Sequence, residues 1–82
     1  MFAGVVAFFI AGQMVDVDVL GGAPDLASCK QYAQKAVEQG QPQFGKDVEI
    51  VVKCFPAEQL KTLDKAAFMA APIAAAGFGT GK

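Results

Sequence analysis

The two cysteines of the chain, Cys29 and Cys54, enclose an amphipathic run and a run rich in β-branched residues. The first run, from Asp25 to Gly40, carries apolar residues at helical spacing and ends on a glycine, which is typical of a helix. Its expected apolar stripe consists of Leu26, Cys29, Ala33, Ala36 and Val37. The second run, from Val48 to Phe55, is typical of a strand. Cys29 therefore belongs to the first turns of a helix, and Cys54 to the end of a strand.

A further strand is predicted before this helix, over residues 14–22. Valines and aspartates alternate there, with Val15, Val17 and Val19 on one face and Asp16 and Asp18 on the other. This is the pattern of a half-buried strand with one solvated face. Strand, helix and strand in this order predict an α/β fold, a small β-α-β unit whose two strands are parallel.

The β-α-β arrangement brings the start of the helix and the end of the second strand to the same end of the sheet. We therefore expect Cys29 and Cys54 to be neighbours and to form a structural disulfide, although a pair of reduced buried thiols and a reactive thiol stay open as alternatives. Closing a loop of about 25 residues stabilises a small domain by about 3 kcal/mol in the chain-entropy model. A disulfide predicts export to an oxidising place: the periplasm or its inner-membrane surface, the cell surface, or a virion.

Apolar segments flank this unit, so that the chain divides into residues 1–13, 14–55 and 56–82. The first segment carries no charged side chain and is predicted to be a signal anchor or a buried packing element, with Ala11-Gly12-Gln13 as its best but poor cleavage site. The last is predicted to be a helix that begins at Pro56, followed by an apolar Ala/Gly-rich tail. Since two strands are too few for a stable sheet, the segment Gly4–Ile10 or a second copy is expected to add strands.

The chain is more apolar than a small soluble domain usually is, with 54% hydrophobic and 18% charged residues. One small core cannot hide this surface, so we expect the flanks to pack against other protein subunits, a lipid bilayer or both, in a homo- or hetero-oligomer. The residues expected to make this packing are Phe2, Val5, Val6, Phe8, Phe9, Ile10, Phe68, Met69, Ile73 and Phe78.

Other classes of function find little support in the composition. The net charge is −1, all basic residues are lysines and tryptophan is absent, which argues against nucleic-acid binding. Histidine is absent and the single serine, Ser28, is not in a nucleophile turn, which argues against an enzyme. The Asp16/Asp18 pair has too few partners for a metal, and the C-terminal "AAGFGTGK" departs from a phosphate loop. No cofactor or small-molecule substrate is expected.

The runs "DLASCKQYAQKAVEQG" and "VEIVVKCF" resemble, over about half of the chain from Val15 to Phe55, a group of small exported proteins encoded by phages and bacteria. These proteins have an apolar leader, a short strand, a helix that begins around a cysteine, and a final strand with a second cysteine. The resemblance implies an exported β-α-β module closed by a disulfide, generally without assigned activity, with Cys29 and Cys54 in the matching positions.

These observations favour a non-enzymatic structural or accessory subunit of a membrane, envelope or phage-virion assembly. The alternative is a secreted or periplasmic binding module or inhibitor, from which the N-terminal segment has been removed and in which the Asp16/Asp18 face or the glutamine-rich loop contacts a partner. An enzyme or redox protein is the third reading, and it needs a cysteine that reacts rapidly in the folded state.

Overall fold

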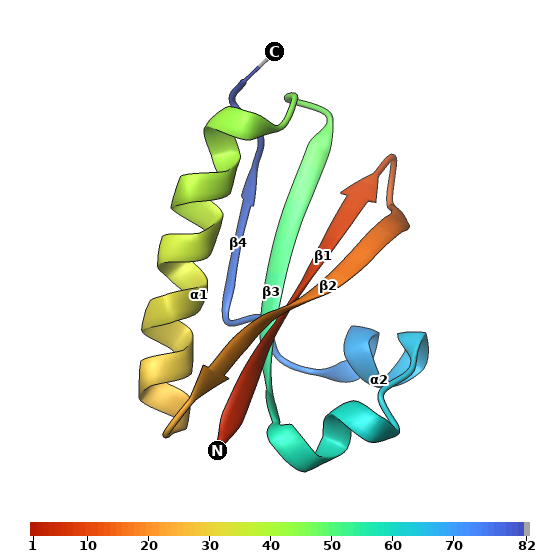
Figure 1. Ribbon diagram of the computed structural model, residues 1–82. Helices are drawn as coiled ribbons and strands as arrows, with labels where there is room; N and C mark the ends of the chain where they lie inside the picture. Colours follow the sequence, from red (N-terminus) through yellow and green to blue (C-terminus); the bar gives the residue numbers. More distant parts are fainter. Residues whose placement is uncertain (82) are drawn as a thin grey trace.

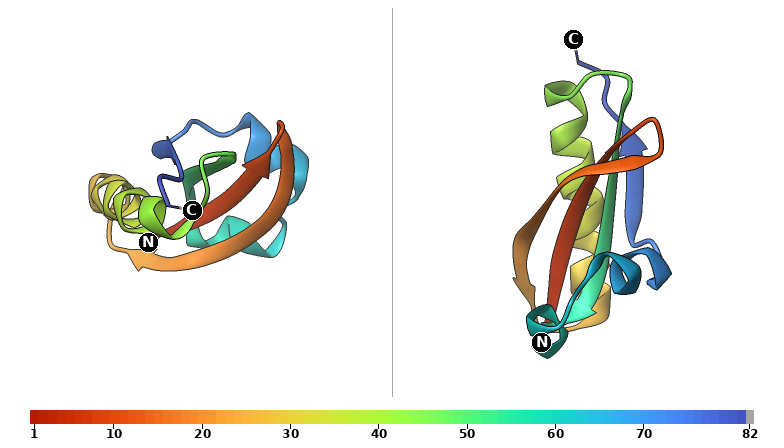
Figure 2. Two further views of the ribbon diagram at one scale, coloured as in Figure 1. Left: turned by 90° about the horizontal axis from the view of Figure 1, so that it is seen from above. Right: turned by 90° about the vertical axis from the view of Figure 1, so that its right-hand side faces the viewer.

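The computed structural model describes residues 1–81 and shows one antiparallel sheet between two helical layers. Helix α1 covers one face, and the short helices η2 and α2 cover the other (Figure 1; Figure 2). In chain order the elements are β1 (Phe2–Ile10), β2 (Gln13–Ala23), α1 (Leu26–Gly40), η1 (Gln41–Gln43), β3 (Val48–Pro56), η2 (Ala57–Lys61), α2 (Lys65–Ala70) and β4 (Ala75–Phe78). The strand order across the sheet is β2-β1-β3-β4, and every neighbouring pair is antiparallel.

The predicted β-α-β unit with parallel strands is wrong. The strands on either side of α1, β2 and β3, do run in the same direction, but β1 lies between them and pairs with both. The physical reason is the apolar N-terminal segment, whose β-branched and aromatic residues suit a strand that is buried on both faces. The expectation that Gly4–Ile10 adds a strand is confirmed, and that strand occupies the centre of the sheet.

The β1–β2 hairpin closes through a two-residue turn at Ala11 and Gly12. Both residues have positive φ, 52° and 80°, as the common right-twisted hairpin turn requires. Two register shifts, between Gly4 and Val5 and between Phe8 and Phe9, interrupt the pairing further along. Such bulges increase the local twist, and β2 curves strongly across β1 (Figure 2).

The core consists of two clusters, one on each face of the sheet. The cluster beneath α1 contains Val6, Ala33, Val37, Ile50 and Val52. The cluster beneath η2 and α2 contains Val5, Ala7, Phe9, Val51, Phe55 and Phe68. Because β1 and β3 supply alternate residues to both clusters, these two strands are nearly continuous apolar runs in the sequence.

Helix α1 agrees with its sequence prediction at both ends. Asp25 is the N-cap, and its carboxylate accepts a hydrogen bond of 2.8 Å from the backbone N–H of Ser28, which lowers the pKa of Asp25. Cys29, Ala33 and Val37 are buried against the sheet, whereas Leu26, also expected in the stripe, stays exposed. The helix therefore packs through a narrow stripe of small side chains.

The predicted C-terminal helix needs correction, because it is broken into η2 and α2. Asp64 is the N-cap of α2, and its carboxylate accepts a hydrogen bond of 2.8 Å from the N–H of Ala67. A capping aspartate in this position begins a new helix rather than continuing the previous one. The residue that anchors α2 is the buried Phe68, and Leu60 and Leu63 pack around the same cluster.

The Ala/Gly-rich tail is ordered as β4 and a close contact beyond it. After β4, the N–H of Gly79 donates to the carbonyl of Val48 at 2.9 Å, and the N–H of Gly81 donates to the carbonyl of Phe44 at 2.9 Å. A Cβ at Gly79 would overlap the carbonyl oxygens of Phe44 and Gly45. Glycine is required there because the two backbones approach too closely for any side chain.

Gly79→Ala is therefore expected to destabilise the protein by about 2 kcal/mol, since the tail must move away from the loop before β3. The matched control is Gly4→Ala in β1, where a Cβ would make only ordinary contacts with Leu20 and Val52. Urea denaturation monitored by circular dichroism measures both variants. Equal stabilities of the two variants would contradict the close packing of the tail.

Candidate interaction surface

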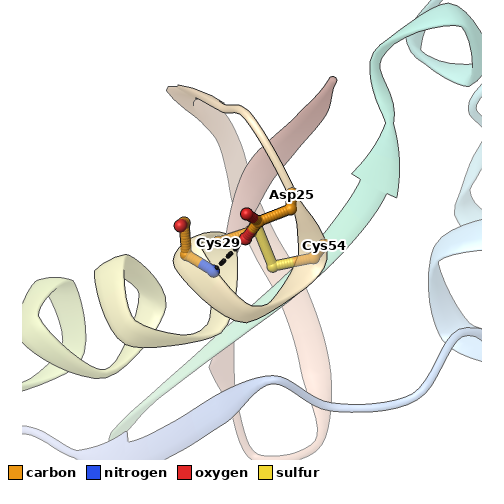
Figure 3. The surroundings of a disulfide bond; sticks show 4 residues. Asp25, Cys29 and Cys54 are labelled. Carbon is orange, nitrogen blue, oxygen red and sulfur yellow. Dashed lines mark hydrogen bonds between the residues drawn. A yellow bond between two sulfur atoms is a disulfide. The ribbon is translucent and has the colours of Figure 1, made fainter.

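The disulfide between Cys29 and Cys54 is present and joins the first turns of α1 to the end of β3 (Figure 3). The Cα atoms of the two cysteines are 6.2 Å apart, within the usual range for a disulfide. Cys29 is buried and Cys54 is partly exposed at the surface. A disulfide in so small a chain indicates an oxidising environment outside the reducing cytosol.

Lys53 is a buried charged residue to which the sequence patterns assign no role. Its side chain is only 4% exposed, and its ammonium group donates to the carbonyls of Phe68 at 2.6 Å and Met69 at 3.2 Å. The same group lies 4.7 Å from the centre of the Phe68 ring. These carbonyls belong to the last turn of α2, where a cation is favourable. Lys53 therefore fixes α2 on the sheet.

Burial lowers the pKa of Lys53 in the native state. At pH values between this lowered pKa and the ordinary pKa of lysine in the unfolded chain, the unfolded chain binds more protons than the native protein. The contribution of Lys53 to the free energy of unfolding therefore rises with pH in this range. We expect the stability difference between wild type and Lys53→Met to move in favour of wild type as the pH becomes alkaline. Urea denaturation over a pH series measures it, with exposed Lys30→Met as control. A difference that is independent of pH would contradict this assignment.

The ten residues expected to pack against a partner fall into three groups. Val5, Val6, Phe9 and Phe68 are buried in the core of the chain itself, where they need no outside partner. Phe2 and Phe8 are partly buried, and Phe8 packs against Phe44 with ring centres 4.7 Å apart. Exposed side chains remain at Ile10 (44%), Met69 (52%), Ile73 (60%) and Phe78 (58%). For these four, packing against a partner stays a prediction.

The valines of β2 are also exposed, although their alternation with aspartates predicts a half-buried strand. Val17 pairs with Ala7 and Val19 with Val5, and both partners belong to the cluster beneath α2. Directly paired residues point to the same side of a sheet, so these two valines lie on the face that α2 covers. They are 45% and 52% exposed, on an edge strand that has a neighbouring strand on one side only.

Two hollows border α2 on this face. One, of about 170 Å³, is lined by Val5, Met14, Val17, Leu63 and Phe68 among others. The other, of about 220 Å³, lies on the opposite side of Phe68 and includes Phe9, Val51, Met69 and Ile73. Phe78 pairs with Glu49, which lines the second hollow, so the Phe78 side chain lies on the same face of the sheet as this hollow. We call Val17, Val19, Met69, Ile73 and Phe78 the α2-side apolar surface.

Groups with catalytic or ligand-binding chemistry do not converge on this surface. Within residues 1–81, no group of three or more His, Cys, Asp and Glu side chains is placed to hold a metal ion. Asp16 and Asp18 are both exposed and accept hydrogen bonds from their own strand. Of the "AAGFGTGK" segment, Ala75–Phe78 form β4, and Gly79 and Gly81 make the contact with the loop before β3. Among the described helices, none is long and apolar enough to cross a bilayer.

Comparison of the chain with family models, with curated proteins and with solved structures gave no match.

Proposed function

We propose that this protein is a non-enzymatic structural or accessory subunit of an exported assembly, in a bacterial envelope, at a membrane or in a phage virion. The observation that carries the proposal is the α2-side apolar surface, whose large side chains stay about half exposed in a chain that has its own core. Apolar side chains that gather beside hollows are typical of a protein–protein or membrane interface. The disulfide supports the exported location.

The geometry of this surface supports packing by side chains. Met69 and Ile73 stand at the rim of the hollow that contains Phe9 and Val51, so an apolar side chain of a partner that enters it meets an apolar floor. Apolar anchors that fill such hollows supply most of the binding free energy at interfaces. Of the two charged side chains near this hollow, Lys53 is buried and bonded to α2, and only Glu49 is partly exposed, so the lining that a partner meets is mainly apolar.

The test is association of the oxidised full chain. We expect sedimentation velocity to show concentration-dependent self-association, or co-sedimentation with phospholipid vesicles, and we expect Met69→Lys/Ile73→Lys to lose it. The matched control is Gln31→Lys/Gln34→Lys, which adds the same charges at exposed positions of α1. A wild-type protein that stays monomeric at all concentrations and does not bind vesicles would contradict the proposal. So would a control that loses association as fully as the surface variant.

A further inference from the structure

The sheet has two free edges, and they differ in length. The edge strand β4 has 4 residues, whereas the edge strand β2 has 11. A long free edge presents unpaired N–H and C=O groups to which a strand of another molecule can add, and natural sheets usually prevent this. A short edge such as β4 needs little protection, but β2 requires some other device.

The hydrogen bonds of β3 show which groups of the sheet point outward. The carbonyl of Val52 accepts from the N–H of Ala74 at 2.9 Å, so Val52 turns its backbone groups toward β4. Backbone groups alternate in direction along a strand, so the neighbouring Val51 turns toward β1. Val51 pairs with Ala7, and Ala7 therefore directs its own N–H and C=O toward β3, away from β2.

The same alternation fixes the outward groups of β2. Val17 pairs with Ala7, and Val19 pairs with Val5, which also directs its groups toward β3. Neither Val17 nor Val19 thus exchanges hydrogen bonds with β1, and the N–H groups of both point away from the sheet. These two groups are the outward donors of Asp16–Val19, the regular stretch between the two bulges of β2.

Both outward donors are already occupied. The N–H of Val17 donates to Oδ1 of Asp16 at 2.9 Å, and the N–H of Val19 donates to Oδ1 of Asp18 at 2.8 Å. Hydrogen bonds to a carboxylate are stronger than those to a neutral carbonyl. A strand that added to this edge would have to displace both carboxylates.

We propose that Asp16 and Asp18 block strand addition at the free edge of β2 by capping the two outward N–H groups of its regular stretch, Asp16–Val19. The charges oppose a second copy of the chain in particular. When Val17 of one copy lies antiparallel to Val17 of another, Asp16 of each copy lies opposite Asp18 of the other, and like charges directly opposite are destabilising. Without the aspartates, Met14–Leu20 would carry no charge and would consist largely of apolar residues, three of them valines, which is typical of an aggregating edge.

The experiment compares the oxidised full-length protein with Asp16→Ala/Asp18→Ala by sedimentation velocity. Both proteins also carry Met69→Lys/Ile73→Lys, and we expect Asp16→Ala/Asp18→Ala to form dimers and larger species at concentrations where this background alone is monomeric. The matched control is Glu38→Ala/Glu58→Ala in the same background, which removes the same charge from two exposed helical positions. A folded Asp16→Ala/Asp18→Ala protein that associates no more than the control would overturn the proposal.

A second measurement on the unmodified protein does not depend on how the variant folds. Amide hydrogen exchange of Val17 and Val19 is expected to be slower than that of an unstructured peptide, because both N–H groups are capped. Exchange of both amides at the unprotected rate would overturn the proposal equally.

Asp16→Asn/Asp18→Asn, which keeps an acceptor oxygen, is expected to associate less than the alanine variant. Because these proteins lack Met69 and Ile73, their association does not involve the two residues that test the proposed function. The two proposals can therefore fail independently.

Discussion

Removal of residues 1–13 is expected to abolish folding. This segment forms β1, which pairs along its whole length with β2 on one side and β3 on the other. It also supplies Val5, Val6 and Phe9 to the two core clusters. Burial of each large apolar side chain contributes about 1.5–3 kcal/mol, and a domain of this size has about 5 kcal/mol of net stability. The loss therefore exceeds what the remaining contacts supply.

The measurement is circular dichroism and amide chemical-shift dispersion of the chain 14–82, with the disulfide formed. Two point variants in the full-length chain distinguish a segment that is needed as strand β1 of the core from one that serves only as an N-terminal anchor. Val6→Asp, at a buried position, is expected to unfold the protein, whereas Ile10→Asp, at an exposed position of the same strand, is expected to be tolerated. A folded chain 14–82 would show that residues 1–13 are dispensable, as a cleaved binding module requires.

Loss of the disulfide is expected to have the second largest effect. Cys29 and Cys54 are 25 residues apart in the sequence, and opening a loop of about 25 residues costs about 3 kcal/mol in the chain-entropy model. Because the whole domain has only about 5 kcal/mol of net stability, a reduced protein would be near the limit of folding. The bond also ties the first turns of α1 to the end of β3.

Urea denaturation with and without a reductant measures this effect, and Cys29→Ala/Cys54→Ala provides the same comparison without a reductant. The double variant is expected to be destabilised to the same extent as the reduced wild type and to be insensitive to the reductant. If reduction lowered the free energy of unfolding by less than about 1 kcal/mol, well under the value for a loop of this length, the disulfide would not be the main covalent support of the fold.

The sequence predicted the local elements of the fold better than their arrangement. The strand around residues 14–22, the helix from Asp25 to Gly40 and the strand from Val48 to Phe55 are all present within a residue or two. Their order alone suggested a parallel pair, because nothing in a single sequence says which strands are neighbours. The disulfide was predicted correctly even so, since its argument needed only the common direction of β2 and β3, and that direction is right.

The features of the surface were harder to predict. Alternating valines and aspartates look alike in an edge strand and in a half-buried strand, so the exposure of Val17 and Val19 depends on the position of β2 in the sheet. Lys53 offered a signal, as a charge that lies between Val51 and Phe55 on one face of the strand, but its partners are backbone carbonyls of a distant helix. The close contact at Gly79 depends on the path of a loop that periodicity does not specify.

The most direct test of the fold is the pattern of Hα–Hα nuclear Overhauser effects around β1. In an antiparallel pair, residues that do not exchange hydrogen bonds bring their Cα atoms to about 4.5 Å, so their Hα atoms nearly touch. The structure predicts strong Hα–Hα effects between Val6 and Val52 and between Ala7 and Val17, which places β1 between β3 and β2. Helical contacts along residues 2–10, or direct contacts between β2 and β3, would contradict it.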